Sequence, residues 1–173
     1  STDLGSVGPV TDLGDGTYTA TLISATTVGT ATVGFTLDGA AGAQTAQASF
    51  VAGPGDPARS VVEADPTTIT ADGVSTSTLT VRLIDANGNP LTSSGGTVVL
   101  ITDAGSVSAT TDQGDGTYTA TLLSPTTTGT ATVSFTVDGV LAEATAAVAL
   151  VAGAADPTLT TIEASPGQVV ADG

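Results

Sequence analysis

The sequence predicts an all-β protein made of immunoglobulin-like antiparallel β-sandwiches, in tandem repeats of about 100 residues. Three observations predict this fold. A long segment of the 173-residue chain occurs twice at a constant offset, apolar and polar residues alternate along several runs, and Gly, Asn and Asp stand between the runs. Short strands with a turn every ~8–12 residues are typical of immunoglobulin-like sandwiches.

The repeated segment is residues 111–139, TDQGDGTYTATLLSPTTTGTATVSFTVDG. Residues 11–39 read TDLGDGTYTATLISATTVGTATVGFTLDG, which is identical at 23 of 29 positions with no insertion. The flanking residues keep the offset of 100, as in Val51-Ala52-Gly53 and Val151-Ala152-Gly153. A repeat of this length is a domain and not one turn of a solenoid.

Two stretches rich in Gly, Pro and Asp, at 53–57 and 153–157, are predicted to be linkers. Residues 1–52 are then the C-terminal part of one repeat, 58–152 form a complete repeat, and 158–173 supply the first strand of a further repeat. We expect the chain to be a segment of a longer repetitive protein.

Alternation with a period of two defines the strands of the complete repeat, because it puts apolar side chains on one face and mostly Thr on the other. We expect these residues to face the core: Leu79, Val81 and Leu83; Tyr118, Ala120 and Leu122; Ala131, Val133, Phe135 and Val137. Seven strands are predicted, at 59–64 with an extension at 67–71, and at 76–85, 96–102, 105–110, 116–123, 129–137 and 142–151.

Composition excludes several functions. The chain has 17 acidic and 2 basic residues and a formal net charge of -15, which disfavours nucleic acid and anionic membrane surfaces as partners. No run of about 20 apolar residues is present that could insert in a membrane. His, Cys and Lys are absent, so nucleophilic triads and Schiff bases cannot form, and we predict that the segment is not an enzyme.

Several motifs carry a family resemblance. ITADG (69–73), STLTVRLIDANGNPL (77–91), TTDQGDGTYTATL (110–122) and GTATVSFTVDG (129–139) resemble the bacterial Ig-like repeats of group 1, the stalk domains of invasin and intimin-type surface proteins. The resemblance implies an extracellular location, at the cell surface or secreted. It also implies a spacer role, with receptor contacts usually confined to terminal domains.

Acidic turn residues suggest one candidate site. In such a sandwich four Asp residues are expected at the pole where the repeat begins, beside one Asp of the incoming linker, and only Asp72 and Asp103 at the opposite pole. Converging carboxylate oxygens suit calcium. The predicted junctional calcium ligands are Asp56, Asp85, Asp112, Asp115 and Asp138.

Ordinary turn chemistry is the alternative to a calcium site, since Asp commonly closes turns through its own main chain. An EF-hand is rejected for residues 85–90, because Pro90 stands where that loop needs Gly and no Glu follows at its twelfth position. Two other side chains are assigned to structure: Tyr118 to the core with its hydroxyl bonded to nearby main chain, and Arg82 to the outer surface, solvated or ion-paired.

The predicted function is a structural stalk or spacer in a long extracellular adhesin-type protein, with neighbouring repeats of the same chain as partners. One alternative is a segment of a self-assembling filament, with lateral contacts to other copies. Another is an accessory carbohydrate-binding module, which needs an exposed aromatic row. Four of the five aromatic residues occupy repeat-equivalent positions that we expect to be core: Tyr18, Tyr118, Phe35 and Phe135.

Overall fold

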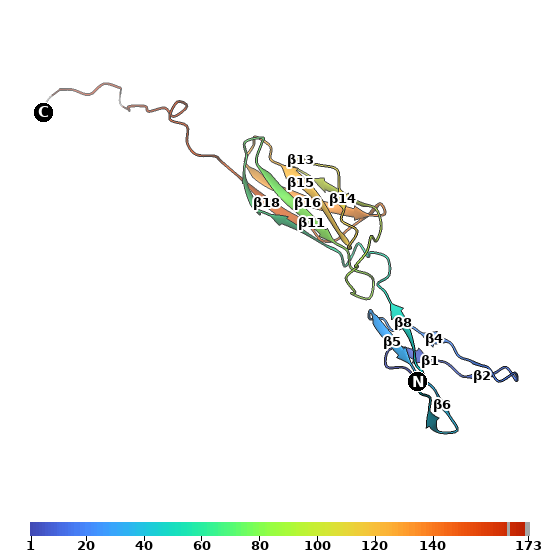
Figure 1. Ribbon diagram of the computed structural model, residues 1–173. Coiled ribbons are helices and arrows are strands. Elements are labelled where there is room, and N and C mark those ends of the chain that lie inside the picture. The colour runs from blue at the N-terminus through green and yellow to red at the C-terminus, as the bar shows by residue number, and fades with distance from the viewer. Residues whose placement is uncertain (166, 172–173) are drawn as a thin grey trace.

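The computed structural model describes residues 1–165 and 167–171, and all regular secondary structure in this part of the chain is β-strand. Figure 1 shows an elongated molecule in which an N-terminal unit and a sandwich follow one another end to end, with the C-terminal segment leading away. Within the described residues there is no helix that could span a membrane.

One sheet of the sandwich consists of β9 (Val61–Asp65), β11 (Thr76–Arg82), β13 (Ser106–Val107), β14 (Thr111–Asp112) and β15 (Thr117–Leu123). Its strand order is β13-β15-β11-β9, with β14 also on β15, and every pair is antiparallel. The predicted strand at 105–110 is thus two short strands. Thr121 donates its N–H to the hydroxyl of Ser108 at 3.0 Å between them, which interrupts the main-chain ladder as a β-bulge does.

The other sheet consists of β10 (Thr68–Thr70), β12 (Val98–Thr102), β16 (Gly129–Val137), β17 (Val140–Leu141) and β18 (Ala146–Val151). Its order is β10-β18-β16-β12, with β17 on β16. The pairing of β10 with β18 is parallel, whereas the other pairs are antiparallel. The first predicted strand and its extension therefore belong to different sheets.

The core lies between the two sheets, and the predicted inward faces are buried as expected. Tyr118 is 3% exposed and Phe135 is 0% exposed. The Tyr118 hydroxyl donates to the carbonyl oxygen of Gly96 at 2.8 Å and accepts from the N–H of Gly95 at 3.1 Å. Arg82 lies on the outer face with its Nε 3.9 Å from Glu63 Oε2. Both assignments are confirmed.

The N-terminal unit repeats the pairing of the second half of the sandwich. Its strands are β1 (Ser6–Val7) on β4 (Leu22–Ile23), β2 (Thr11–Asp12) on β3 (Tyr18–Thr19), β5 (Gly29–Val33) on β8 (Ala46–Phe50) and β6 (Thr36–Leu37) on β7 (Ala40–Ala41). Gly29 faces Phe50 in the register just as Gly129 faces Leu150. The two copies therefore share their local topology.

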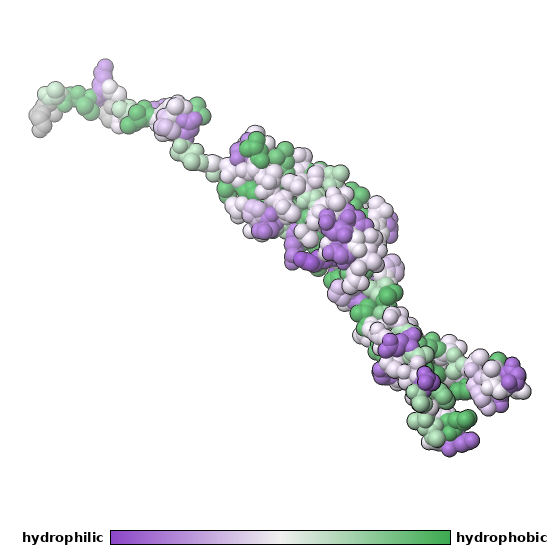
Figure 2. Space-filling model, viewed as in Figure 1, coloured by the Kyte–Doolittle hydropathy of each residue, from purple (hydrophilic) through white to green (hydrophobic). Residues whose placement is uncertain are grey.

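The inward face of the N-terminal unit is open. Tyr18 and Phe35 are 56% and 55% exposed, so the expectation that they would be core residues is wrong for this chain. The reason is packing: β9, β10, β11 and β12 complete the two sheets of the sandwich, and their counterparts for the first copy are not among these residues. Figure 2 shows hydrophobic surface at this end of the molecule.

Beyond Val151 the described residues form no strand. In the sandwich, β9 needs β11 and β10 needs β18 as partners, and residues 158–165 and 167–171 have no such partners here. The predicted first strand of a further repeat therefore stays a prediction, and residues 166, 172 and 173 lie outside the described part of the chain.

Candidate functional site

The junction between the N-terminal unit and the sandwich is the candidate site. The loop 83–97, between β11 and β12, lies at the pole where the linker 53–57 enters. Gly55 forms a β-bridge with Asp85, and the N–H of Asp56 donates to the carbonyl oxygen of Ile84 at 2.8 Å. The linker is thereby attached to the loop by main-chain hydrogen bonds.

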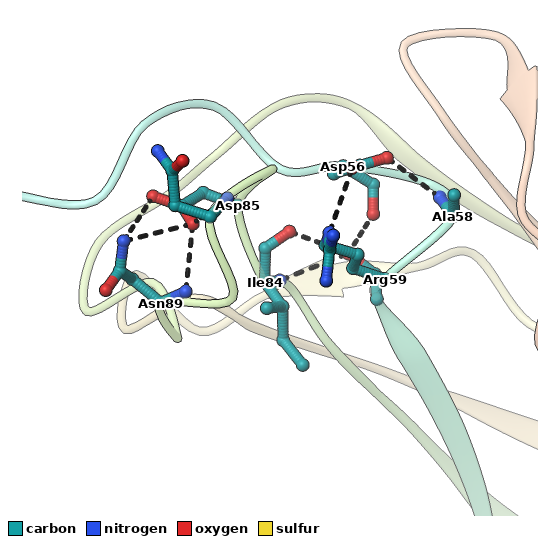
Figure 3. Close-up of polar contacts among 8 residues, drawn as sticks. Asp56, Ala58, Arg59, Ile84, Asp85 and Asn89 are labelled. Carbon is teal, nitrogen blue, oxygen red and sulfur yellow. Dashed lines mark hydrogen bonds and ion pairs between the residues drawn. The ribbon is translucent and has the colours of Figure 1, made fainter. Parts of the chain in front are cut away.

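Asp85 organises this loop. Asp85 is only 2% exposed. Figure 3 shows its side chain between the linker and Asn89. The carboxylate accepts hydrogen bonds from the N–H of Gly53 at 3.0 Å, from the N–H groups of Asn87 and Asn89 at 2.9 Å each, and from Nδ2 of Asn89 at 2.9 Å. The Asn89 side chain, followed by the main-chain donors, holds the pKa of Asp85 well below its usual range.

Asn89 connects this loop to the preceding unit. Its Nδ2 donates to the carbonyl oxygen of Thr26 at 2.8 Å, and its Oδ1 accepts from the N–H of Val28 at 3.3 Å. Thr26 and Val28 lie in the turn between β4 and β5. The side-chain amide of Asn89 thus binds two residues that precede it by 61 and 63 positions in the sequence.

Asp56 closes the turn that leads into β9. Its Oδ1 accepts from the N–H of Ala58 at 2.9 Å, and its Oδ2 lies 3.8 Å from Nε of Arg59 (Figure 3). Its main-chain oxygen accepts from the N–H of Arg59 at 3.1 Å and of Ser60 at 2.9 Å. The hydroxyl of Ser60 in turn accepts from the N–H of Ile84 at 3.1 Å. The turn is therefore tied to the same loop as the linker.

The other predicted ligands accept hydrogen bonds too, Asp115 from its own turn, Asp112 from its own turn and from Ser94, and Asp138 from the loop 83–97. Hydrogen bonds from the Ser94 side chain and from the Gly114 N–H, at 2.8 Å, lower the pKa of Asp112. Those from the Thr117 hydroxyl and N–H, at 2.6 and 3.0 Å, lower the pKa of Asp115. Asp138 accepts from the N–H of Thr97 at 2.7 Å.

All five predicted ligands lie at the pole where the linker enters, as expected from the strand order. At the opposite pole Asp72 binds Ser75 and Ser124, and Asp103 binds Thr132. In the part of the chain that the structure describes, no three His, Cys, Asp or Glu side chains come close enough together to hold a metal ion. The calcium site and its alternative, ordinary turn chemistry, both stay predictions.

Sequence reasoning missed the part that Asn89 plays in the junction, and with it Gly53, Thr26 and Val28. The signal was present in the motif Asp85-Ala86-Asn87-Gly88-Asn89, for which the sequence predicted a calcium ligand at Asp85 or an ordinary turn. A turn explains the bonds within residues 85–89, whereas the contact with residues 26–28 depends on how two domains meet.

The two-sheet sandwich and the bonded junction define a protein of tandem immunoglobulin-like domains. A family model described as "Invasin, domain 3" matches residues 1–53 and 56–153, and the chain belongs to this family. The resemblance noted in the sequence is thereby confirmed. Its class is that of the Ig-like domains of bacterial adhesins, which are displayed at the cell surface.

Solved structures agree with this assignment. Invasin, described as a bacterial integrin-binding protein, is 35% identical over 88% of this chain and 32% of its own, with a TM-score of 0.61. InvD of Yersinia pseudotuberculosis is 30% identical over 94% of this chain and 49% of its own, with a TM-score of 0.63. The Escherichia coli adhesin FdeC is 29% identical over 89% of this chain and 52% of its own, with a TM-score of 0.67. The chain thus spans between a third and about half of these structures.

Proposed function

We propose that this chain is a stalk segment of a longer adhesin and that its repeats act as spacers which hold a binding domain away from the cell. Membership of the invasin domain 3 family supports this proposal, as does the similarity to proteins described as adhesins. Because the chain covers 32% to 52% of the solved relatives described above, we assign it the spacing role and no receptor.

The observation that carries the proposal is the bonded junction. A spacer must resist bending, and bending occurs where few contacts cross between domains. Here Gly53 and Asp56 of the linker donate to the sandwich, and Asn89 of the sandwich binds the preceding unit. Pro54 and Pro57 restrict the linker further, because their rings fix φ.

Strand direction supports a load-bearing role. The strands of the sandwich run roughly along its long axis (Figure 1), and the chain enters and leaves at opposite poles. Tension on the two ends pulls β10 and β18 in opposite directions along their parallel axes. The N–H of Ala71 donates to Val151 and that of Ala149 donates to Thr67, at 2.8 Å each, so these bonds share the load in shear.

Surface charge fits the same role. Seventeen acidic residues against two basic ones, a net charge of -15, keep neighbouring stalks soluble and apart through mutual repulsion. The exposed aromatic residues Tyr18 and Phe35 lie on the inward face of an incomplete sandwich, and this position offers no support for the carbohydrate-binding alternative.

Small-angle scattering and sedimentation velocity test the proposal on the full chain. We expect an elongated monomer whose scattering is reproduced by one relative orientation of the N-terminal unit and the sandwich. Scattering that requires a broad ensemble of orientations would contradict the stalk proposal. Concentration-dependent growth into long assemblies would favour the filament alternative instead.

A further inference from the structure

The turn at residues 26–28 binds the side chain of Asn89, and we call it the acceptor turn because it receives this side chain from the next domain. The amide of Asn89 binds a carbonyl oxygen and an N–H two residues apart, at 2.8 Å from Thr26 O and 3.3 Å from Val28 N. A main-chain peptide group of an adjacent β-strand makes this kind of paired contact. Asn89 thus recognises main chain, and the contact does not depend on which side chains residues 26–28 carry.

Asp85 determines the orientation of the Asn89 amide. A carboxylate only accepts hydrogen bonds, so the amide nitrogen of Asn89 must face Asp85, where it lies 2.9 Å from Oδ2. The Asn89 oxygen is then left facing Val28. The turn is closed by main-chain bonds as well, from Asp85 N to Asn89 O at 2.9 Å and from Gly88 N to Asp85 O at 3.0 Å. The amide is therefore positioned before the neighbouring unit binds.

The sandwich carries the same acceptor turn at its opposite pole. Residues 126–128 are the counterparts of 26–28 at the offset of 100, and they are exposed in this chain. The turn is held by Ser124, whose hydroxyl donates to Asp72 at 3.1 Å and accepts from the N–H of Gly73 at 3.2 Å. The two turns differ only at Val28 and Thr128, a side chain that the contact does not use.

We propose that residues 126–128 are a docking site for the Asp-x-Asn-x-Asn turn of a following repeat of the same kind, bound through Thr126 O and Thr128 N. This inference rests on the proposed stalk function and adds the contact that joins one repeat to the next. The sandwich carries the Asn turn at one pole and the acceptor turn at the other. Because only main-chain groups are read, any repeat can follow any other with one fixed orientation.

The joint can be tested first in the chain as it stands. The sequence has no cysteine, so Gln47→Cys and Thr121→Cys place one spin label on the exposed surface of each unit. We expect a single narrow distance distribution in the parent chain. Asn89→Asp should broaden it, because an aspartate cannot donate to Thr26, and Asn89→Ala should do the same without added charge.

Matched controls separate the joint from general effects. Asn87→Asp adds the same charge to the same loop at an exposed side chain and should leave the distribution narrow, as should Val28→Thr, which copies the second acceptor turn. A narrow distance distribution in both Asn89 variants, with melting curves that show folded protein, would overturn the proposed role of Asn89 in the joint and leave the stalk proposal standing. A broad distribution in the parent chain would contradict the stalk proposal itself.

The docking site at 126–128 is tested by extending the chain after Ala152 with a second copy of residues 53–152. We expect hydrogen exchange of the Thr128 amide to slow by about fivefold or more once it is bonded. Asn89→Asp in the added copy only should restore the faster exchange. Unchanged exchange of Thr128 in the extended chain would overturn the docking site.

Discussion

The N–H of Gly53 lies 3.0 Å from Oδ2 of Asp85, so a residue that follows one domain is bonded to a buried side chain of the next. Asp85 is 2% exposed and also holds Asn89, which reaches the turn of the preceding unit. Linker and interdomain contact therefore depend on one carboxylate. The consequences of this arrangement can be measured.

Asp85→Asn should remove the contribution of residue 85 to the pH dependence of stability, because an amide does not titrate. The pKa of Asp85 is lowered in the folded protein by its hydrogen bonds, whereas an unfolded aspartate has a pKa of about 3.9. The stabilisation is therefore complete above the unfolded pKa and is lost as the pH falls through the folded one. We expect the melting temperature of the parent chain to exceed that of the variant at pH 7.

The difference between the two proteins should shrink as the pH is lowered below about 4. Melting curves of both proteins from neutral pH downward provide the measurement, and taking the difference removes the contributions of the other acidic residues. A gap that stays constant over this range would show that the Asp85 charge does not contribute to stability.

Tyr118→Phe should destabilise the sandwich by about 1 kcal/mol, because the hydroxyl bonds both Gly95 and Gly96 and its removal leaves these groups without their partner. Tyr18→Phe is the matched control. It changes the equivalent residue of the other copy, whose side chain is 56% exposed, and should alter the free energy of unfolding by less than about 0.5 kcal/mol. Equal effects in urea denaturation would contradict this difference.

Ala71→Pro should lower the force needed to unfold the sandwich when it is pulled from its two ends. Proline has no N–H, so the variant loses the bond from Ala71 to Val151 at 2.8 Å, which joins the parallel pair β10 and β18. Force spectroscopy of the full chain is the measurement. Ala155→Pro, which lies outside both sheets, is the control and should leave the unfolding force unchanged. An unchanged unfolding force in Ala71→Pro would show that β10 does not bear the load.

If the acidic residues act as ordinary turn residues, calcium should raise the melting temperature no more than magnesium does at about millimolar concentration, the range of weak extracellular sites. The expectation follows from the occupied carboxylates, since N–H donors already bind Asp85 and Asp138. Thermal melting with either ion or with chelator provides the test. A rise specific to calcium that Asp138→Ala abolishes would support the junctional calcium site instead.

Much of the fold could be predicted from periodicity. The alternation in residues 77–84, 117–123 and 130–137 identified the buried side chains correctly, because a strand between two sheets must alternate. The parallel pair β10 and β18 could not be predicted in this way, since periodicity says nothing about which sheet a strand joins. The strand order of the fold predicted the correct pole for the acidic turns, whereas the contact of Asn89 with residues 26–28 depends on how two domains meet and was not predicted.

The sequence by itself determined the local turns. The turn at Asp56 recurs at Asp156, where the N–H of Leu159 lies 3.1 Å from Asp156 O just as that of Arg59 lies 3.1 Å from Asp56 O, although the described residues after the second turn form no strand. Such bonds need only neighbouring residues. Tertiary structure decided the rest: Tyr18 and Tyr118 have the same neighbours in sequence, yet one is 56% exposed and the other 3%, because burial of Tyr118 also needs strands that are distant in the sequence, such as β11 beside it.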